Sequence, residues 1–118
     1  MVTPIFQISD YQQALDFYID WLGFRIDWEE QSARGPLYMQ VSRGGIVLHL
    51  TSHPEESCAG AKAMAEINGL IAFHYLLTQK ASAYPSPVLQ KTYWSDKVMQ
   101  VEVTDPFGNI LVFAELCA

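Results

Sequence analysis

The chain contains 118 residues, of which 50% are hydrophobic and 17% are charged, a composition that is typical of a compact globular domain and excludes disordered, collagen-like and coiled-coil proteins. Its formal net charge of -6 makes nucleic acid an unfavourable partner, because an acidic surface repels phosphates. The charge is compatible with a cationic ligand, and solubility alone explains it equally well. No apolar run approaches the ~20 residues that span a bilayer and no signal sequence follows Met1, so we expect a cytoplasmic protein without membrane association.

The first segment of the chain predicts a strand followed by a helix. The strand is expected over Thr3–Ile8, and Asp10 with Gln13 then forms the pattern of a helix-capping box. Apolar residues recur at helical spacing over the next turns: Ala14, Phe17, Tyr18, Trp21 and Leu22. Gly23 follows at the usual place of a left-handed helix cap.

Three strands complete the first half, which we assign as module one, residues 1–51. They are expected at Phe24–Trp28, Leu37–Ser42 and Ile46–Thr51, the last two joined by a tight turn at Arg43-Gly44-Gly45. The order of elements is therefore βαβββ. Because side chains alternate along a strand, Val47, His49 and Thr51 share one face.

A connector is expected over residues 52–68, with one or two helical turns at Ala59–Glu66. Module two, residues 69–118, is expected to begin with a strand at Leu70–Leu77 and to continue with a short helix inside Thr78–Tyr84. Three further strands and one turn follow: Val88–Thr92, Val98–Val103, the turn Asp105–Asn109, and Ile110–Leu116. The second half thus also predicts βαβββ.

Strand alternation in the expected strand Leu70–Leu77 places His74 on the same face as Leu70, Ala72 and Leu76. A curved sheet that is covered by helices on one side can enclose a cavity on the other. His49 and His74 are then among the few polar groups of that cavity. Cys58 and Cys117 lack the spacing of a metal or redox motif, so two thiols are expected.

Three segments resemble the vicinal oxygen chelate superfamily, which includes the glyoxalases, the bleomycin resistance proteins and the extradiol dioxygenases. They are Asp10 with Ala14–Tyr18 and Leu22-Gly23-Phe24, then Val47–Leu50, then Val103–Asn109. The chain looks closest to the small bleomycin-resistance-like members. The resemblance covers nearly the whole chain and implies a single α+β domain over 1–118, in which two βαβββ modules form curved mixed sheets around a cavity.

The resemblance also implies a homodimer, with modules that pair either within one chain or between chains. Metal-dependent members carry four ligands, on the first and last strands of each module. On this sequence those positions are Thr3, His49, His74 and Val112. Valine cannot coordinate a metal and threonine is a poor neutral ligand, whereas firm binding needs about three imidazole or carboxylate donors.

Two carboxylates lie near the position of Val112 without replacing it. Glu102 is not at a ligand position, and Glu115 falls on the opposite strand face. We therefore expect no metal cofactor, with a divalent ion on His49 and His74 as the alternative.

Several aromatic residues are candidates for stacking on a planar or cationic ligand, with ordinary packing in the core or at a dimer interface as the alternative. Tyr93 and Trp94 are the strongest, because they lie in a polar loop where burial is not required; Trp28, Tyr38 and Tyr75 are further candidates. The acids at Asp27, Glu29 and Glu30 can attract a basic ligand or simply form a solvated strand end. His53 is expected at the surface.

The sequence thus predicts a protein that sequesters an antibiotic or other small organic ligand in a dimer groove without chemistry. His49 and His74 are the expected polar anchors, with Trp94 stacking on the ligand. One alternative is a divalent-metal-dependent lyase, isomerase or dioxygenase that uses both histidines and a further carboxylate. Another is a purely structural dimer.

Overall fold

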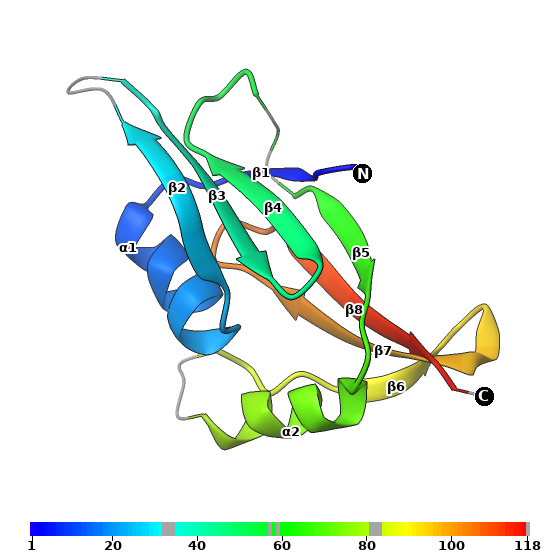
Figure 1. Cartoon of the computed structure of the whole chain (residues 1–118). Coiled ribbons are helices and arrows are strands. Elements are labelled where there is room, and N and C mark those ends of the chain that lie inside the picture. Colours follow the sequence, from blue (N-terminus) through cyan, green and yellow to red (C-terminus); the bar gives the residue numbers. More distant parts are fainter. Residues whose placement is uncertain (32–34, 57, 59, 81–83, 118) are drawn as a thin grey trace. The chain divides into compact units, whose positions relative to one another are not determined.

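The computed structural model describes residues 1–118 apart from 32–34, 57, 59, 81–83 and 118 (Figure 1). The chain divides into two compact units. Unit 1 comprises Met1–Ala61 with the turn Asp105–Asn109, and unit 2 comprises Lys62–Thr104 with Ile110–Ala118. In the described part of the chain, no helix has the length and apolar character needed to cross a membrane.

Unit 1 holds a four-stranded mixed sheet and one continuous helical segment. The elements are β1 (Ile5–Gln7), α1 (Tyr11–Ala14), η1 (Leu15–Trp21), β2 (Arg25–Gln31), β3 (Leu37–Arg43) and β4 (Ile46–Thr51). The strand order is β1-β4-β3-β2. β1 pairs with β4 in parallel and the other pairs are antiparallel.

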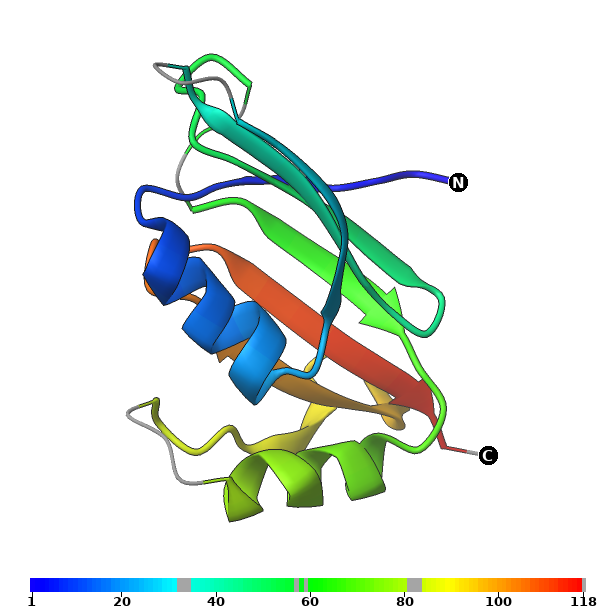
Figure 2. The same ribbon diagram turned by 60° about the vertical axis from the view of Figure 1, so that its left-hand side comes forward.

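The helix of unit 1 begins as the sequence predicts. The Asp10 carboxylate accepts a 2.9 Å hydrogen bond from the backbone N–H of Gln13, which satisfies a free amide of the first turn. The helix then widens into the π-helical segment η1, where Leu22 N–H bonds to the carbonyl of Phe17 at 3.0 Å. Gly23, with φ of +84°, ends the helix and turns the chain into β2 (Figure 2).

The core of unit 1 forms between this helix and one face of the sheet. On the strands it takes Phe6, Met39, Val41, Leu48 and Leu50, each at most 1% exposed. Phe17 and Tyr18 of η1 are equally buried, and their rings meet edge to face at 4.9 Å. Val47, His49 and Thr51 point to the other side of β4, as predicted. We call that side of the sheet the His49 face.

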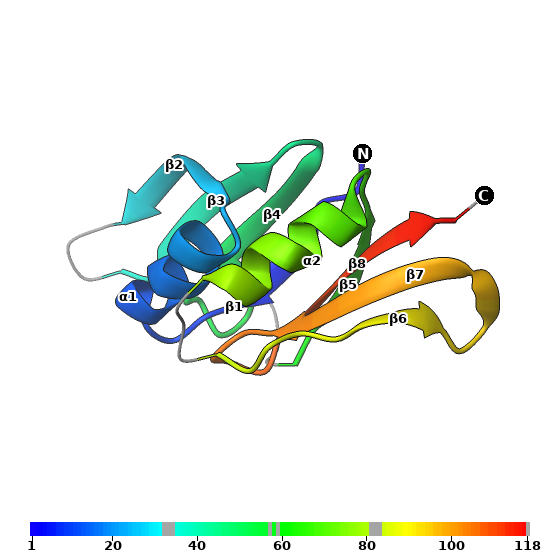
Figure 3. The ribbon, with the colours of Figure 1, turned by 90° about the horizontal axis from the view of Figure 1, so that it is seen from below.

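Unit 2 holds a second mixed sheet of the same topology. Its elements are β5 (Lys62–Glu66), α2 (Leu70–Gln79), β6 (Leu89–Thr92), β7 (Ser95–Thr104) and β8 (Ile110–Leu116) (Figure 3). The strand order β5-β8-β7-β6, with β5 parallel to β8, repeats the order of unit 1. The expected α+β class and its two βαβββ modules are therefore confirmed.

The expected strand at Leu70–Leu77 is wrong, because these residues form helix α2. Leu70, Phe73 and Leu77 are its buried residues, and their spacing is that of one helix face. The Phe73 ring packs against Phe113 of β8 with centroids 4.7 Å apart. Thr78 and Gln79 close the same helix, so the separate short helix expected from Thr78 is also wrong; its positions 81–83 lie outside the described residues.

The first strand of the second module lies in the segment expected to be a connector. Lys62–Glu66 forms β5, not the helical turns expected over Ala59–Glu66, of which Ala59 lies outside the described residues. Ala63 and Ala65 alternate with more exposed residues along it. Alanine favours helices, but the parallel pairing of five residues with β8 overrides that local preference.

Candidate functional site

A β-bulge at Asp27 determines what lies on the His49 face. Ile26 pairs with Val41, yet Trp28 pairs with Gln40, so Asp27 is an extra residue in β2. A bulge of this kind re-aims the side chains that follow it. Because Gln40 also pairs with His49, Trp28 joins them on the His49 face instead of entering the core.

Three rings assemble on this face into what we call the Trp28 cluster: Trp28, Tyr38 and His49. The rings of Trp28 and Tyr38 are stacked, with an interplanar angle of 8° and centroids 6.0 Å apart. The imidazole of His49 meets both edge to face, at 5.5 Å from Trp28 and 5.2 Å from Tyr38. Trp28 is 40% exposed, so the cluster presents an aromatic surface that an approaching molecule can reach.

A chain of hydrogen bonds fixes the imidazole within the cluster. The side-chain N–H of Gln40 donates to Asp27 at 3.0 Å, which turns the Gln40 carbonyl oxygen toward Nε2 of His49, also at 3.0 Å. Nε2 therefore carries the proton in the neutral ring. Nδ1 then accepts from the Tyr38 hydroxyl at 2.7 Å. Neither ring nitrogen keeps a free lone pair.

The chain of hydrogen bonds ends at the carboxylate of Asp27, which is held ionised. Hydrogen bonds from Gln40 and then Ser42, with a smaller contribution from Arg25, lower the pKa of Asp27. The Ser42 hydroxyl lies 3.0 Å from Asp27 and the Arg25 Nε 3.2 Å from it. A fixed negative charge at this end orders the direction of donation along the whole chain.

Tyr38 lies at the other end of this hydrogen-bond chain, close to negatively charged side chains. Burial, and to a smaller extent the charge of Glu56, raise the pKa of Tyr38, so its hydroxyl keeps its proton at neutral pH. Glu30 is the direct partner of Tyr38 in the β2–β3 register. Since the phenolic proton is directed to His49, the Tyr38 oxygen offers only lone pairs to a ligand.

The four positions that metal-dependent relatives would use do not supply a donor set here. In β1 the residue paired with His49 is Ile5, Thr3 precedes the strand, and Val112 is buried. His74 lies on α2, not on a strand, and its Nε2 bonds to the carbonyl oxygen of Pro87 at 2.8 Å. Across the described residues there is no group of three or more His, Cys, Asp or Glu side chains able to hold an ion. These residues do not fit the divalent metal that the resemblance to metal-dependent proteins implies.

The two nearby carboxylates are engaged elsewhere. Glu115 accepts hydrogen bonds of 2.9 Å from the backbone N–H groups of Gly69 and Leu70 and thereby caps α2. Its side chain lies on the face of β8 that Val112 does not share, as expected. Glu102 lies beside Val112 in the register. Its carboxylate is 3.3 Å from Nζ of Lys62.

The other aromatic candidates lie in unit 2. Tyr93 and Trp94 occupy the turn between β6 and β7, with Tyr93 fully exposed and Trp94 55% exposed. Trp94 lines a hollow of about 210 Å³ with Met64, Val98 and Leu116. Tyr75 is exposed on α2, not on the strand where it was expected.

Some placements lie outside the candidate site. His53 is half-buried and its Nδ1 accepts a hydrogen bond from the N–H of Glu55. Cys58 and Cys117 are exposed thiols. Sequence reasoning missed Gln40 and Ser42. Their signal is the alternation along β3, where Tyr38, Gln40 and Ser42 interleave with buried Leu37, Met39 and Val41.

A family model described as "Glyoxalase superfamily protein" matches residues 1–118. A comparison with curated proteins finds no match. Solved structures share the fold. The bleomycin-binding protein from bleomycin-producing Streptomyces verticillus, solved with copper(II)-bleomycin, gives a TM-score of 0.72 at 21% identity, covering 99% of this chain and 94% of that one. An antibiotic-binding protein from Streptomyces sp. CB03234 gives a TM-score of 0.70 at 18% identity, covering 97% of this chain and 93% of that one. A glyoxalase family protein from Enterococcus faecalis gives 0.65 at 17% identity, covering 97% and 94%.

Proposed function

Since the chain belongs to the glyoxalase superfamily, we propose that it is a binding protein of that superfamily that sequesters a small organic cation without chemical change. The observation that carries the proposal is the Trp28–Tyr38 pair on the His49 face. A cation held over an indole or phenol ring is attracted by the negative face of the ring. Stacked rings that are partly exposed give a planar organic molecule an apolar surface as well.

The charge around the cluster supports a cationic ligand. Residues 1–61 contain eight Asp and Glu, three Arg and no Lys. Of the arginines, Arg25 is within 3.2 Å of Asp27. Glu30 and Glu56 lie close to Tyr38, as the register and the raised pKa of Tyr38 indicate. A negative field of this kind draws in cations and repels anions.

The hydrogen-bond chain supports binding without chemistry. His49 is held between Tyr38 and Gln40 by both ring nitrogens, so its neutral ring has no lone pair left to act as a general base or metal ligand. We propose that no metal cofactor takes part. His49 instead anchors Tyr38, whose oxygen accepts a hydrogen bond from an N–H group of the ligand. His74, bonded to Pro87, is not part of the proposed site.

Antibiotics are the ligand class that the comparisons suggest, since structures of the same fold are described as bleomycin-binding and antibiotic-binding proteins. We further propose a homodimer. Met64 of β5, Leu116 of β8 and Trp94 of the β6–β7 turn are between 54% and 62% exposed, and clustered exposed apolar side chains commonly mark an interface. Sedimentation equilibrium tests this part, and a monomer at all concentrations would contradict it.

The ligand class is tested with two probes of one shape, N-methylquinolinium and neutral quinoline, each titrated by calorimetry at pH 7.5. We expect the cation to bind about tenfold more tightly, the size of one cation–π contact, and to weaken as salt is added. Trp28→Leu should remove that preference, and mass spectrometry should recover the probe unchanged. Equal binding of both probes would reject the cation and leave the binding function standing.

Two further variants locate the site. Glu30→Gln should weaken binding of N-methylquinolinium and leave binding of quinoline unaffected, since the substitution removes a charge without changing the shape of the side chain. Trp94→Leu in unit 2 serves as the matched aromatic control and should change the affinity for neither probe. Loss of binding in Trp94→Leu alone would move the site away from the Trp28 cluster and overturn the assignment.

A further inference from the structure

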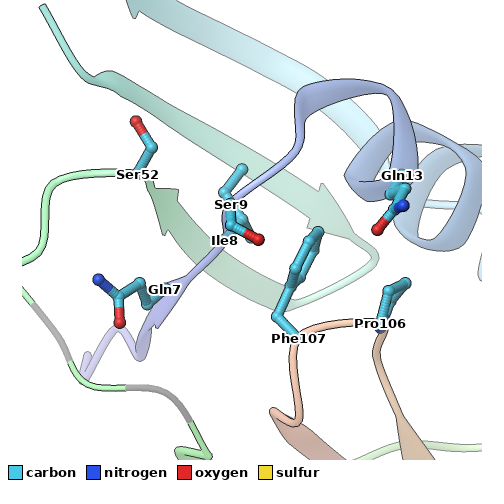
Figure 4. A pocket seen from close by; sticks show the side chains of 7 residues that line it. All are labelled: Gln7, Ile8, Ser9, Gln13, Ser52, Pro106 and Phe107. Atoms are coloured by element: carbon cyan, nitrogen blue, oxygen red, sulfur yellow. The ribbon is translucent and has the colours of Figure 1, made fainter.

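A second hollow lies in unit 1 and shares no residue with the Trp28 cluster. Its volume is about 490 Å³, within the range of ~300–1,000 Å³ that is usual for small-molecule sites. Figure 4 shows its lining side chains, which come from β1, α1 and the connection between them, from the residue after β4 and from the turn after β7: Gln7, Ile8, Ser9, Gln13, Ser52, Pro106 and Phe107.

The polar side chains of this hollow are uncharged and available. Within the described residues, the side chains of Gln7, Ser9 and Gln13 make no hydrogen bond to another protein group. The Ser52 oxygen accepts a 2.8 Å bond from the N–H of Leu37, which leaves its own proton to donate. Two amides and two hydroxyls thus offer both donors and acceptors and carry no charge.

Phe107 is fixed in position at the centre of this polar lining. Its backbone N–H donates to the Asp105 carboxylate at 2.9 Å. The same turn is tied to β1, because the Asn109 amide donates to the carbonyl of Gln7 at 2.7 Å. In Figure 4 the ring projects toward the space between Gln13 and Ser9. A half-buried ring held by a rigid turn is a ready-made flat apolar platform.

From this lining we infer that the hollow binds a neutral, polyhydroxylated ligand, a saccharide unit. A pyranose has one face of C–H groups that packs on an aromatic ring and a rim of hydroxyls that both donate and accept. Amide and hydroxyl side chains around a ring match that pattern. Among the described residues, no charged side chain lines this hollow to replace the hydration that a charged ligand would give up on binding, so the lining favours a neutral ligand.

The test uses the full chain and three neutral probes: methyl α-D-glucopyranoside, maltose and lactose. Saturation-transfer NMR should show contact with at least one probe, and amide shifts should map to residues 7–13 and 106–107. Gln13→Ala should weaken that probe about fivefold, the usual effect of one lost hydrogen bond. Gln12→Ala is the matched control, because the Gln12 amide bonds to Asp16 at 2.8 Å outside the hollow.

A second variant distinguishes the role of the Phe107 ring in binding from its role in stability. Phe107→Leu keeps an apolar side chain and the backbone bond to Asp105, so it should abolish saccharide contact while the melting temperature changes little. Trp28→Leu should leave saccharide binding unchanged, whatever the outcome for the cation. Absence of contact with all three probes, or equal weakening in Gln12→Ala and Gln13→Ala, would overturn the inference.

Discussion

Tyr18 and Asp105 lie 87 positions apart, and the phenol of Tyr18 donates a buried 2.6 Å hydrogen bond to the carboxylate of Asp105. Asp105 also accepts from the N–H groups of Phe107 and Asn109 and from the Asn109 amide. The turn between β7 and β8 is thereby built into the core of unit 1.

Removing this phenol should destabilise the protein markedly. Tyr18→Phe leaves a buried carboxylate without its shortest partner, and we expect the free energy of unfolding to fall by about 1.5–3 kcal/mol. Urea denaturation measures it. The control is Tyr11→Phe, which removes an exposed bond of 2.9 Å to Glu29 and should cost under about 0.5 kcal/mol. Equal losses in the two variants would contradict a buried, charge-assisted bond.

The same pair predicts a loss of stability in alkali. Burial first, then the charge and hydrogen bond of Asp105, raise the pKa of Tyr18. The unfolded state therefore releases this proton near pH 10 while the folded state retains it. The contribution of Tyr18 is complete below pH ~10 and declines as pH rises above it. Urea titrations between pH 8 and 11 should show a steeper decline in wild type than in Tyr18→Phe; parallel curves would refute this.

The tautomer of His49 can be read directly. We expect long-range ¹⁵N NMR at pH 8 to show the proton on Nε2, because the Gln40 oxygen faces that nitrogen at 3.0 Å. Gln40→Met removes this acceptor and should shift the population toward the other tautomer. His53, whose Nδ1 accepts from the Glu55 amide, is an internal reference that this variant should not affect. An Nδ1-protonated ring in wild type would reverse the proposed direction of donation.

Glu115 should stabilise α2 through its position at the helix start. Its two oxygens each accept one backbone N–H, from Gly69 and Leu70, so Glu115→Ala should cost about 1–2 kcal/mol by loss of the cap and of its charge. Glu66→Ala, at an exposed position on β5, is the matched control and should be nearly neutral. Chemical denaturation followed by circular dichroism compares them.

Metal content tests the binding proposal against the enzyme alternative. After dialysis against Mn²⁺ or Ni²⁺ and removal of free ion, we expect well under one ion per chain, with no difference between wild type and His49→Ala. The reason is that both nitrogens of His49 are already bonded and Val112 supplies no donor. One tightly held ion that His49→Ala releases would favour a metal-dependent enzyme.

The first module could be predicted from sequence because its signals are local. Asp10, Gly23 and the Gly44-Gly45 turn each mark a boundary that the structure confirms. The start of the second module could not. An apolar run such as Leu70–Leu77 fits a strand or a buried helix equally. The alanines of Lys62–Glu66 favour a helix, although this segment forms strand β5.

The candidate site was predictable only in part. Alternation along β4 placed His49 on the correct face, and Trp28 and Tyr38 were singled out as aromatic surfaces. That these three residues meet depends on the bulge at Asp27, which no local pattern marks. The partners of His49 lie on other strands, so their identity follows from register alone.

The bulge has an evolutionary consequence. If Asp27 stayed in the chain but were paired regularly, Trp28 would lie opposite Met39 instead of Gln40, and Trp28 and Glu30 would turn to the core side of the sheet. Substitutions at these positions would therefore change the chemistry of the exposed face and leave the core intact, whereas loss of the bulge without loss of a residue would remove the indole from that face.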